Sequence, residues 1–143
     1  MCLGDYSKFG AGRSCQVLLV GGDKAYQEEL AVGLELLGLS IVTATSAGDA
    51  LAIVTQNDHV GVVITDIRVP GMSDLELATR ILSARHTEQS VEVIILANYI
   101  AHRVRQEAKR LGIFACLDLS SSVESIAVAI NAAMANVRTS RPV

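Results

Sequence analysis

The sequence has few aromatic residues and no long apolar run, and each shortage excludes a class of protein. Aromatic side chains make up 3% of the 143 residues. Every apolar run ends well short of the roughly 20 residues that a transmembrane helix requires. Residues 1–5 lack the basic start and apolar core of a secretory signal. The sequence therefore predicts neither membrane insertion nor export.

Cysteine and histidine are also scarce. Cys2, Cys15 and Cys116 show no C-x-x-C spacing, which argues against a disulfide framework or a zinc site. The histidines are scattered, and no carboxylate or cysteine lies at metal-ligand spacing from them. We expect a reducing, cytoplasmic location, with Cys116 as a small apolar residue within an apolar run.

The charge balance gives no support for direct binding to nucleic acid. The formal net charge is −3 and the isoelectric point is near 5.5, whereas nucleic-acid-binding domains are typically basic. Half of the residues are hydrophobic, and most of these are aliphatic. Such a composition favours a buried parallel sheet covered by helices.

Short apolar runs alternate with amphipathic segments along the chain. Strands are predicted at 16–20, 40–45, 60–65, 91–96 and 113–117. Helices are predicted at 24–37, 46–56, 73–85, 101–111 and 121–137. This alternation predicts an α/β fold with a doubly wound, five-stranded parallel sheet in the order 2-1-3-4-5, as in flavodoxin-like proteins. Residues 15–138 would form the domain, between a tail at 1–14 and a tail or linker at 139–143.

Ser and Gly residues mark the predicted helix ends. Capping boxes begin at Ser46, Ser73 and Ser121, and Gly38 and Gly112 stop two of the helices. The core stripe of the first helix is predicted to comprise Leu30, Ala31, Leu34 and Leu37. That of the last comprises Ile126, Ala127, Ile130, Ala133 and Met134.

The third predicted strand ends in a single carboxylate, Asp66, and a Pro70-Gly71 turn follows. The carboxyl ends of strands in an open α/β sheet face the ligand crevice, and the switch point here lies between the first and third strands. Asp66 should therefore share one crevice with the loop after Val20. An acid at this position indicates a metal or phosphoryl site, or the remnant of one.

The segment from the third strand through Asp66 to Pro70-Gly71-Met72 resembles the phosphoacceptor strand and loop of receiver domains in bacterial two-component response regulators. The resemblance extends over about residues 16–137, with matching patterns at Val17–Val20 and Ala47–Leu51. It implies a signalling module, not an enzyme, whose aspartate accepts a phosphoryl group from a histidine kinase. In the family, an acidic pair and that aspartate hold Mg²⁺, and a lysine contacts the phosphate. A Thr or Ser relays the conformational switch that follows phosphorylation.

The sequence departs from that pattern around the acceptor. Gly21 and Gly22 stand where the family has the acidic pair. Ala97 replaces the Thr or Ser, and Leu119 replaces the lysine. An aromatic switch residue of many receivers is replaced by Cys116. Mg²⁺ prefers several oxygen ligands, so one carboxylate should bind it weakly. We therefore expect an atypical receiver that acts as a protein-interaction module with impaired magnesium-dependent phosphorylation.

Two alternatives remain open at the crevice. Asp23 could join Asp66 in holding Mg²⁺, which would make Asp66 a working phosphoacceptor, or it could cap the first helix. Gly21 and Gly22 could instead cradle a phosphate, as in a flavodoxin-like small-ligand binder, but the G-x-G-x-x-G pattern is absent.

The fourth predicted helix is strongly basic. Its cations are Arg103, Arg105, Lys109 and Arg110, with His102 at its start. This is either a solvated surface or, with Tyr99 and Cys116, an interaction face for an acidic partner. The resemblance implies that such a face serves dimerisation and output, so the expected partners are a histidine kinase or other signalling protein, an effector domain or a second copy.

Overall fold

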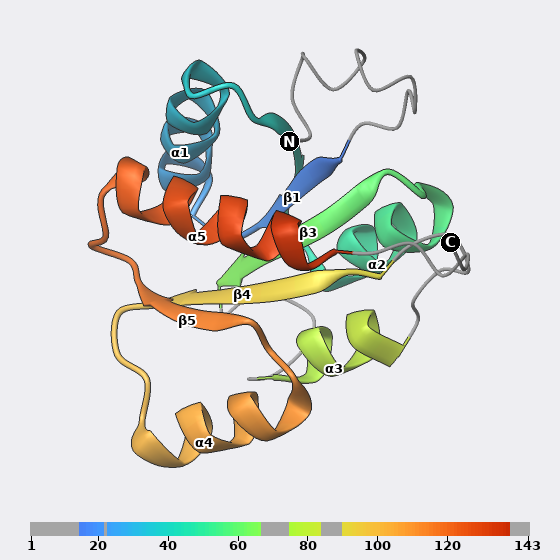
Figure 1. Cartoon of the computed structure of the whole chain (residues 1–143), viewed down its shortest axis with the longest axis vertical. Helices are drawn as coiled ribbons and strands as arrows, with labels where there is room; N and C mark the ends of the chain where they lie inside the picture. Colours follow the sequence, from blue (N-terminus) through green and yellow to red (C-terminus); the bar gives the residue numbers. More distant parts are fainter. Residues whose placement is uncertain (1–14, 22, 67–74, 84–89, 138–143) are drawn as a thin grey trace.

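The computed structural model describes residues 15–21, 23–66, 75–83 and 90–137. A parallel sheet lies between two layers of helices (Figure 1). The strands are β1 (Gln16–Val20), β2 (Ser40–Ala44), β3 (Val60–Asp66), β4 (Glu92–Ala97) and β5 (Ala115–Asp118). Their spatial order is β2-β1-β3-β4-β5, and all four pairs of neighbours are parallel. The predicted fold class and strand order are confirmed.

The helices are α1 (Lys24–Leu36), α2 (Ala47–Gln56), α3 (Glu76–Ser83), α4 (His102–Leu111) and α5 (Val123–Asn136). Helices α1 and α5 cover one face of the sheet, and α2, α3 and α4 cover the other (Figure 1). Each face has its own core, because side chains alternate along a strand. In β1, for example, Leu18 packs with the α2–α4 layer and Leu19 with the α1–α5 layer.

Helix α1 buries a different stripe from the predicted one. Leu30 and Leu34 are buried as expected, but Leu37 is 47% exposed and Gln27 is buried. The Gln27 side-chain amide donates to the carbonyl oxygens of Leu19, at 3.1 Å, and Ala44, at 2.8 Å. Because both bonds satisfy the amide N–H groups, a polar side chain can lie inside without a large desolvation cost.

The last strand and helix begin later than predicted. The α4 C-cap, Gly112, is left-handed (φ 88°), and the Ile113 N–H bonds back to Ala108, so β5 starts at Ala115 rather than at 113. The cap of α5 is Ser122, not Ser121, and its Oγ accepts from the Ser125 N–H at 3.1 Å. The predicted core stripe of α5 is buried in full.

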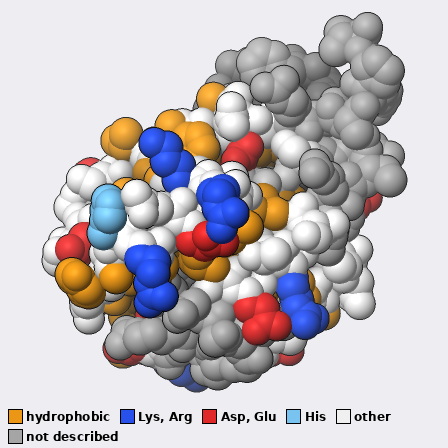
Figure 2. Space-filling model, turned by 90° about the horizontal axis from the view of Figure 1, so that it is seen from below, with side chains coloured by type: hydrophobic (Ala, Val, Ile, Leu, Met, Phe, Trp, Pro, Cys, Tyr) orange, Lys and Arg blue, Asp and Glu red, His pale blue; other side chains and the backbone are white. Residues whose placement is uncertain are grey.

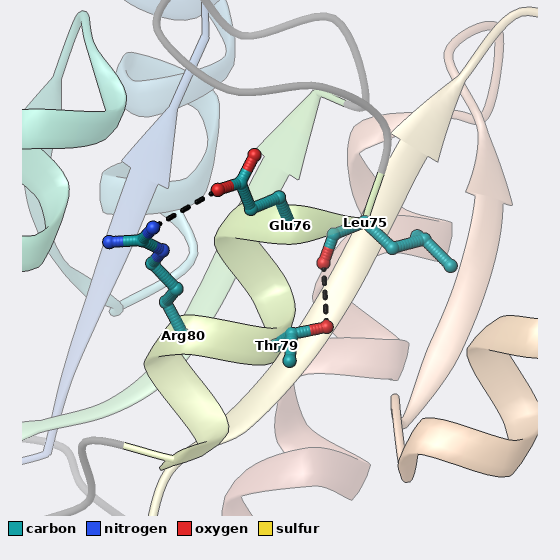
Figure 3. Close-up of polar contacts among 4 residues, drawn as sticks. All are labelled: Leu75, Glu76, Thr79 and Arg80. Carbon is teal, nitrogen blue, oxygen red and sulfur yellow. Dashed lines mark hydrogen bonds and ion pairs between the residues drawn. The ribbon is translucent and has the colours of Figure 1, made fainter.

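Helix α3 has one apolar, buried side and one polar, exposed side. Leu77, Ala78 and Ile81 are buried. On the outer side Arg80 pairs with Glu76 at 3.2 Å, and the Thr79 hydroxyl donates to the Leu75 carbonyl at 3.0 Å (Figure 3). The predicted cap at Ser73 lies outside the described residues.

Candidate functional site

Asp66 is the last residue of β3 and lies at the switch point of the sheet. In the register of the strands, Thr65 pairs with Val20 of β1, and Asp66 pairs with Leu96 of β4. A small pocket of about 20 Å³ opens beside it. Its lining includes Gly21, Asp23, Tyr26, Asp66, Leu96 and Leu119. Four of the residues that the sequence analysis selected therefore meet at one place.

Ala97, which stands at the family's Thr or Ser position, follows Leu96, a residue that lines this pocket. Ala97 ends β4 and is only 3% exposed. Its carbonyl oxygen accepts a hydrogen bond of 3.0 Å from the Leu119 N–H, which holds the segment after β5 against β4. Gly22 lies outside the described residues.

Asp23 is the N-cap of α1. Its backbone is extended (φ −92°, ψ 104°), and Oδ1 accepts a hydrogen bond of 3.1 Å from the Tyr26 N–H. This is the geometry expected of a capping aspartate. The same residue lines the pocket, so capping and proximity to Asp66 occur together.

Leu119 presents hydrocarbon where the family resemblance implies a lysine. Its side chain is half-buried and packs against the core of the α1–α5 layer. Its carbonyl oxygen accepts a hydrogen bond of 3.2 Å from the Tyr26 hydroxyl. Beside Asp66 the pocket therefore has an apolar wall and a phenol, and no side-chain cation among the described residues that line it.

Tyr26 is a site residue that the sequence analysis did not select. Burial raises the pKa of its hydroxyl, and the neighbouring Asp66 charge raises that pKa further, so the group stays a hydrogen-bond donor at neutral pH. One weak signal was available: Tyr26 comes one turn after Asp23, at the start of a helix that opens from the crevice. Nothing in the local pattern connects it with Leu119.

The donor set fits a resident magnesium ion poorly. Mg²⁺ demands near-octahedral oxygen coordination. Across the described part of the chain no group of three or more His, Cys, Asp or Glu side chains could hold a metal. Asp66 and Asp23 are the described carboxylates that line the pocket, and one oxygen of Asp23 already accepts the Tyr26 N–H.

The basic side chains predicted on the fourth helix are on its surface. His102, Arg103, Arg105, Lys109 and Arg110 are exposed, and Tyr99 is 81% exposed. Lys and Arg side chains gather on the face that holds α4 (Figure 2). Arg110 forms an ion pair with Glu107 on the same helix. This exposure is compatible both with a solvated surface and with an interaction face.

Cys116 lies on β5, the strand against which α4 packs. The side chain is half-buried and packs against the core of the α2–α4 layer. Burial raises the pKa of its thiol, and the nearby Arg105 charge opposes that change. Cys116 thus contributes to packing in this layer, and its place on the interaction face stays a prediction. No helix in the described ranges is long and apolar enough to cross a bilayer.

Comparison with known proteins identifies the family. The family model of the response regulator receiver domain matches residues 17–131. The chain belongs to the response regulator receiver domain family, whose members are signalling modules of two-component systems.

Two curated relatives illustrate the similarity. The transcriptional regulatory protein FixJ of Azorhizobium caulinodans is 32% identical over 121 residues, which cover 85% of this chain and 56% of FixJ. The two-component response regulator ORR27 of Oryza sativa subsp. japonica is 42% identical over 67 residues, 46% of this chain and 11% of that protein. The chain thus spans about half, or much less, of the length of these relatives.

Solved structures share the fold. A receiver domain from Clostridium thermocellum has 25% identity and a TM-score of 0.77, over 85% of this chain and 95% of that one. A response regulator from Burkholderia pseudomallei, solved with a phosphorylated aspartic acid and a calcium ion, has 21% identity and a TM-score of 0.72, over 86% of this chain and 71% of that one.

Proposed function

We propose that this chain is an atypical receiver domain that works as a protein-interaction module in two-component or phosphorelay signalling, with impaired magnesium-dependent phosphorylation of Asp66. One observation carries the proposal: the pocket beside Asp66 is lined by Gly21 and Leu119, where the family places a carboxylate and a lysine. We further propose a bacterial, cytoplasmic setting.

The missing groups matter because of the chemistry. Transfer of a phosphoryl group to a carboxylate brings several negative charges together, and catalysis depends on positioning and on neutralising that charge. Leu119 supplies no cation, and Ala97 supplies no hydroxyl to bind the product. Tyr26 also lines the pocket, but its hydroxyl donates to the Leu119 carbonyl. Asp66 therefore lacks the cation and the hydroxyl that would help it to accept and hold a phosphoryl group.

The test is incubation with acetyl phosphate and magnesium, followed by intact mass measurement. We expect no stoichiometric gain of a phosphoryl group. A gain of one group that disappears in Asp66→Asn would overturn the proposal. It would support the alternative of a phosphoacceptor served by a histidine kinase.

The variant Asp23→Ala tests whether a gain of a phosphoryl group would require Asp23 as a metal ligand. The variant loses the cap in either case, so helix stability falls by about 0.5–2 kcal/mol. The modification disappears if Asp23 is also a metal ligand, and it persists if Asp23 only caps α1. The further alternative, a flavodoxin-like ligand binder, has little support, because a pocket of about 20 Å³ holds little more than one water molecule.

We assign protein binding to the α4 face. Its exposed Tyr99, Arg103, Arg105, Lys109 and Arg110 suit an acidic partner, such as a signalling protein, an effector domain or another copy. This assignment is independent of the state of Asp66. Replacing Arg105 and Lys109 by Gln should slow association with that partner, most strongly at low salt.

A further inference from the structure

Helices α1 and α4 carry opposite charge. Helix α4 contains four Arg and Lys residues and one acid, Glu107. Helix α1 has the opposite balance, because it contains one cation, Lys24, and three acids, Glu28, Glu29 and Glu35. The net charge of the whole chain is only −3, so it does not reveal that the two helices carry opposite charge.

On α4 the basic residues form a stripe, whose positive charge comes from Arg105, Lys109 and Arg110. His102, Arg105 and Lys109 follow the i, i+3, i+7 spacing that places residues on one side of a helix. Together with Gln106 and Arg110 they line a shallow surface hollow. Glu107, the acid of this helix, does not line that hollow, and it pairs with Arg110. The stripe therefore keeps a net positive charge.

On α1 two acids have the same seven-residue separation. Glu28 and Glu35 are both exposed, and Val32 between them is 57% exposed. Leu36, the next apolar residue on this surface, is 81% exposed. Seven residues of helix span about 10.5 Å, so the acidic pair on α1 is as long as the stripe from His102 to Lys109, within which Arg105 and Lys109 carry positive charge.

The two helices cannot meet within one chain. Helix α1 packs with β2 and α5 on one face of the sheet, whereas α4 packs with β5 on the other (Figure 1). The acids of α1 and the cations of α4 can therefore meet each other only between two molecules. We propose that α1 of one copy docks its Glu28–Glu35 side on the α4 stripe of a second copy. The contact is head-to-tail, so it leaves one α1 and one α4 open and allows further copies to add.

Such a contact should be weak and sensitive to salt. Exposed ion pairs each contribute little, and their attraction extends over about 30 Å at 0.01 M salt but only about 3 Å at 1 M. The apolar side chains of Val32 and Leu36 add contact area that salt does not screen. The inference rests on the proposed function only in treating α4 as an interaction face.

Sedimentation velocity of the full chain at a series of concentrations tests the proposal. The average mass should rise with concentration at about 0.01 M salt and much less at about 1 M. Glu28→Gln with Glu35→Gln, and separately Arg105→Gln with Lys109→Gln, should each weaken association about tenfold. Arg80→Gln, which removes an exposed cation of α3, is the matched control and should leave association unchanged.

Charge reversal gives the sharper result. Glu28→Lys with Glu35→Lys makes both stripes positive, and Arg105→Glu with Lys109→Glu makes both negative. Each variant alone should stay monomeric, while an equal mixture should associate again.

Three outcomes would overturn the proposal: a wild-type chain that stays monomeric at low salt, a mixture that does not associate, or α1 variants that associate like the wild type while α4 variants do not. The last would indicate a different occupant on α4. None of these outcomes depends on phosphorylation of Asp66, so this proposal and the proposed function fail separately.

Discussion

The hydroxyl of Tyr26 donates a hydrogen bond of 3.2 Å to the carbonyl oxygen of Leu119, across 93 positions of the sequence. This bond ties the first turn of α1 to the segment that follows β5. The same segment is held to β4 by the Leu119 N–H. Tyr26 and Leu119 therefore fix one wall of the pocket that contains Asp66.

Removing this bond should cost stability. In Tyr26→Phe the Leu119 carbonyl loses its phenol donor, and we expect the free energy of unfolding to fall by about 0.5–1.5 kcal/mol. Urea denaturation measures the change. Tyr99→Phe is the matched control, because Tyr99 is 81% exposed, and it should change stability by no more than about 0.5 kcal/mol. Equal effects from the two variants would contradict the structural role of Tyr26.

The raised pKa of Tyr26 predicts a pH dependence. Burial, and then the Asp66 charge, hold the pKa of the phenol above its ordinary value of 10.0. The folded state binds that proton more tightly than the unfolded chain does. The associated stability is thus complete below pH 10 and is lost as the pH rises through the folded pKa.

Ultraviolet titration of the phenolate, compared between the wild type and Tyr26→Phe, would locate this ionisation. Asp66→Asn should lower the pKa of Tyr26, because it removes the charge that opposes the phenolate. An unchanged value in Asp66→Asn would show that burial alone sets it.

Gly21 should tolerate a restored carboxylate. A Cβ atom there would meet no heavy atom within 4 Å, and its backbone is not left-handed. We expect Gly21→Asp to fold and to bind Mg²⁺ more tightly, because a third carboxylate would then line the pocket with Asp66 and Asp23. Adding Leu119→Lys and Gly22→Asp should then permit labelling by acetyl phosphate.

Titration calorimetry with MgCl₂ would measure the change in affinity. Gly48→Asp is the control, since Gly48 is exposed on α2 and its Cβ would also meet no heavy atom within 4 Å. If both variants strengthen Mg²⁺ binding equally, the gain reflects net charge and not a restored site.

Two glycines should respond to alanine in opposite directions. Gly112 adopts φ +88° at the end of α4, so Gly112→Ala should cost about 1–2 kcal/mol of unfolding free energy. Gly48 lies within α2 in open space, so Gly48→Ala should stabilise by about 0.4–1 kcal/mol. Thermal denaturation of the two variants tests both signs, and a loss of stability in Gly48→Ala would count against the helical assignment.

The sheet and the position of Asp66 could be predicted because they depend on local patterns. Runs such as Val17–Val20 identify buried parallel strands, alternation with helices indicates right-handed βαβ units, and 2-1-3-4-5 is a common order for such units. The shift of the α5 cap from Ser121 to Ser122 reflects three consecutive serines, each able to cap. Gln27 and Tyr26 could not be predicted, because their partners lie far away in the sequence, on β1, on β2 and in the segment after β5, and their bonds exist only after folding.

The division of the interior into two cores bears on how this chain can evolve. Ile81 of α3 and Ile130 of α5 belong to different cores, with the sheet between them. Substitutions at sites that share no neighbours usually have additive effects on stability. The α4 surface can therefore acquire a new specificity through mutations that leave the packing of α1 and α5 unchanged, and the two layers of one domain can diverge at different rates.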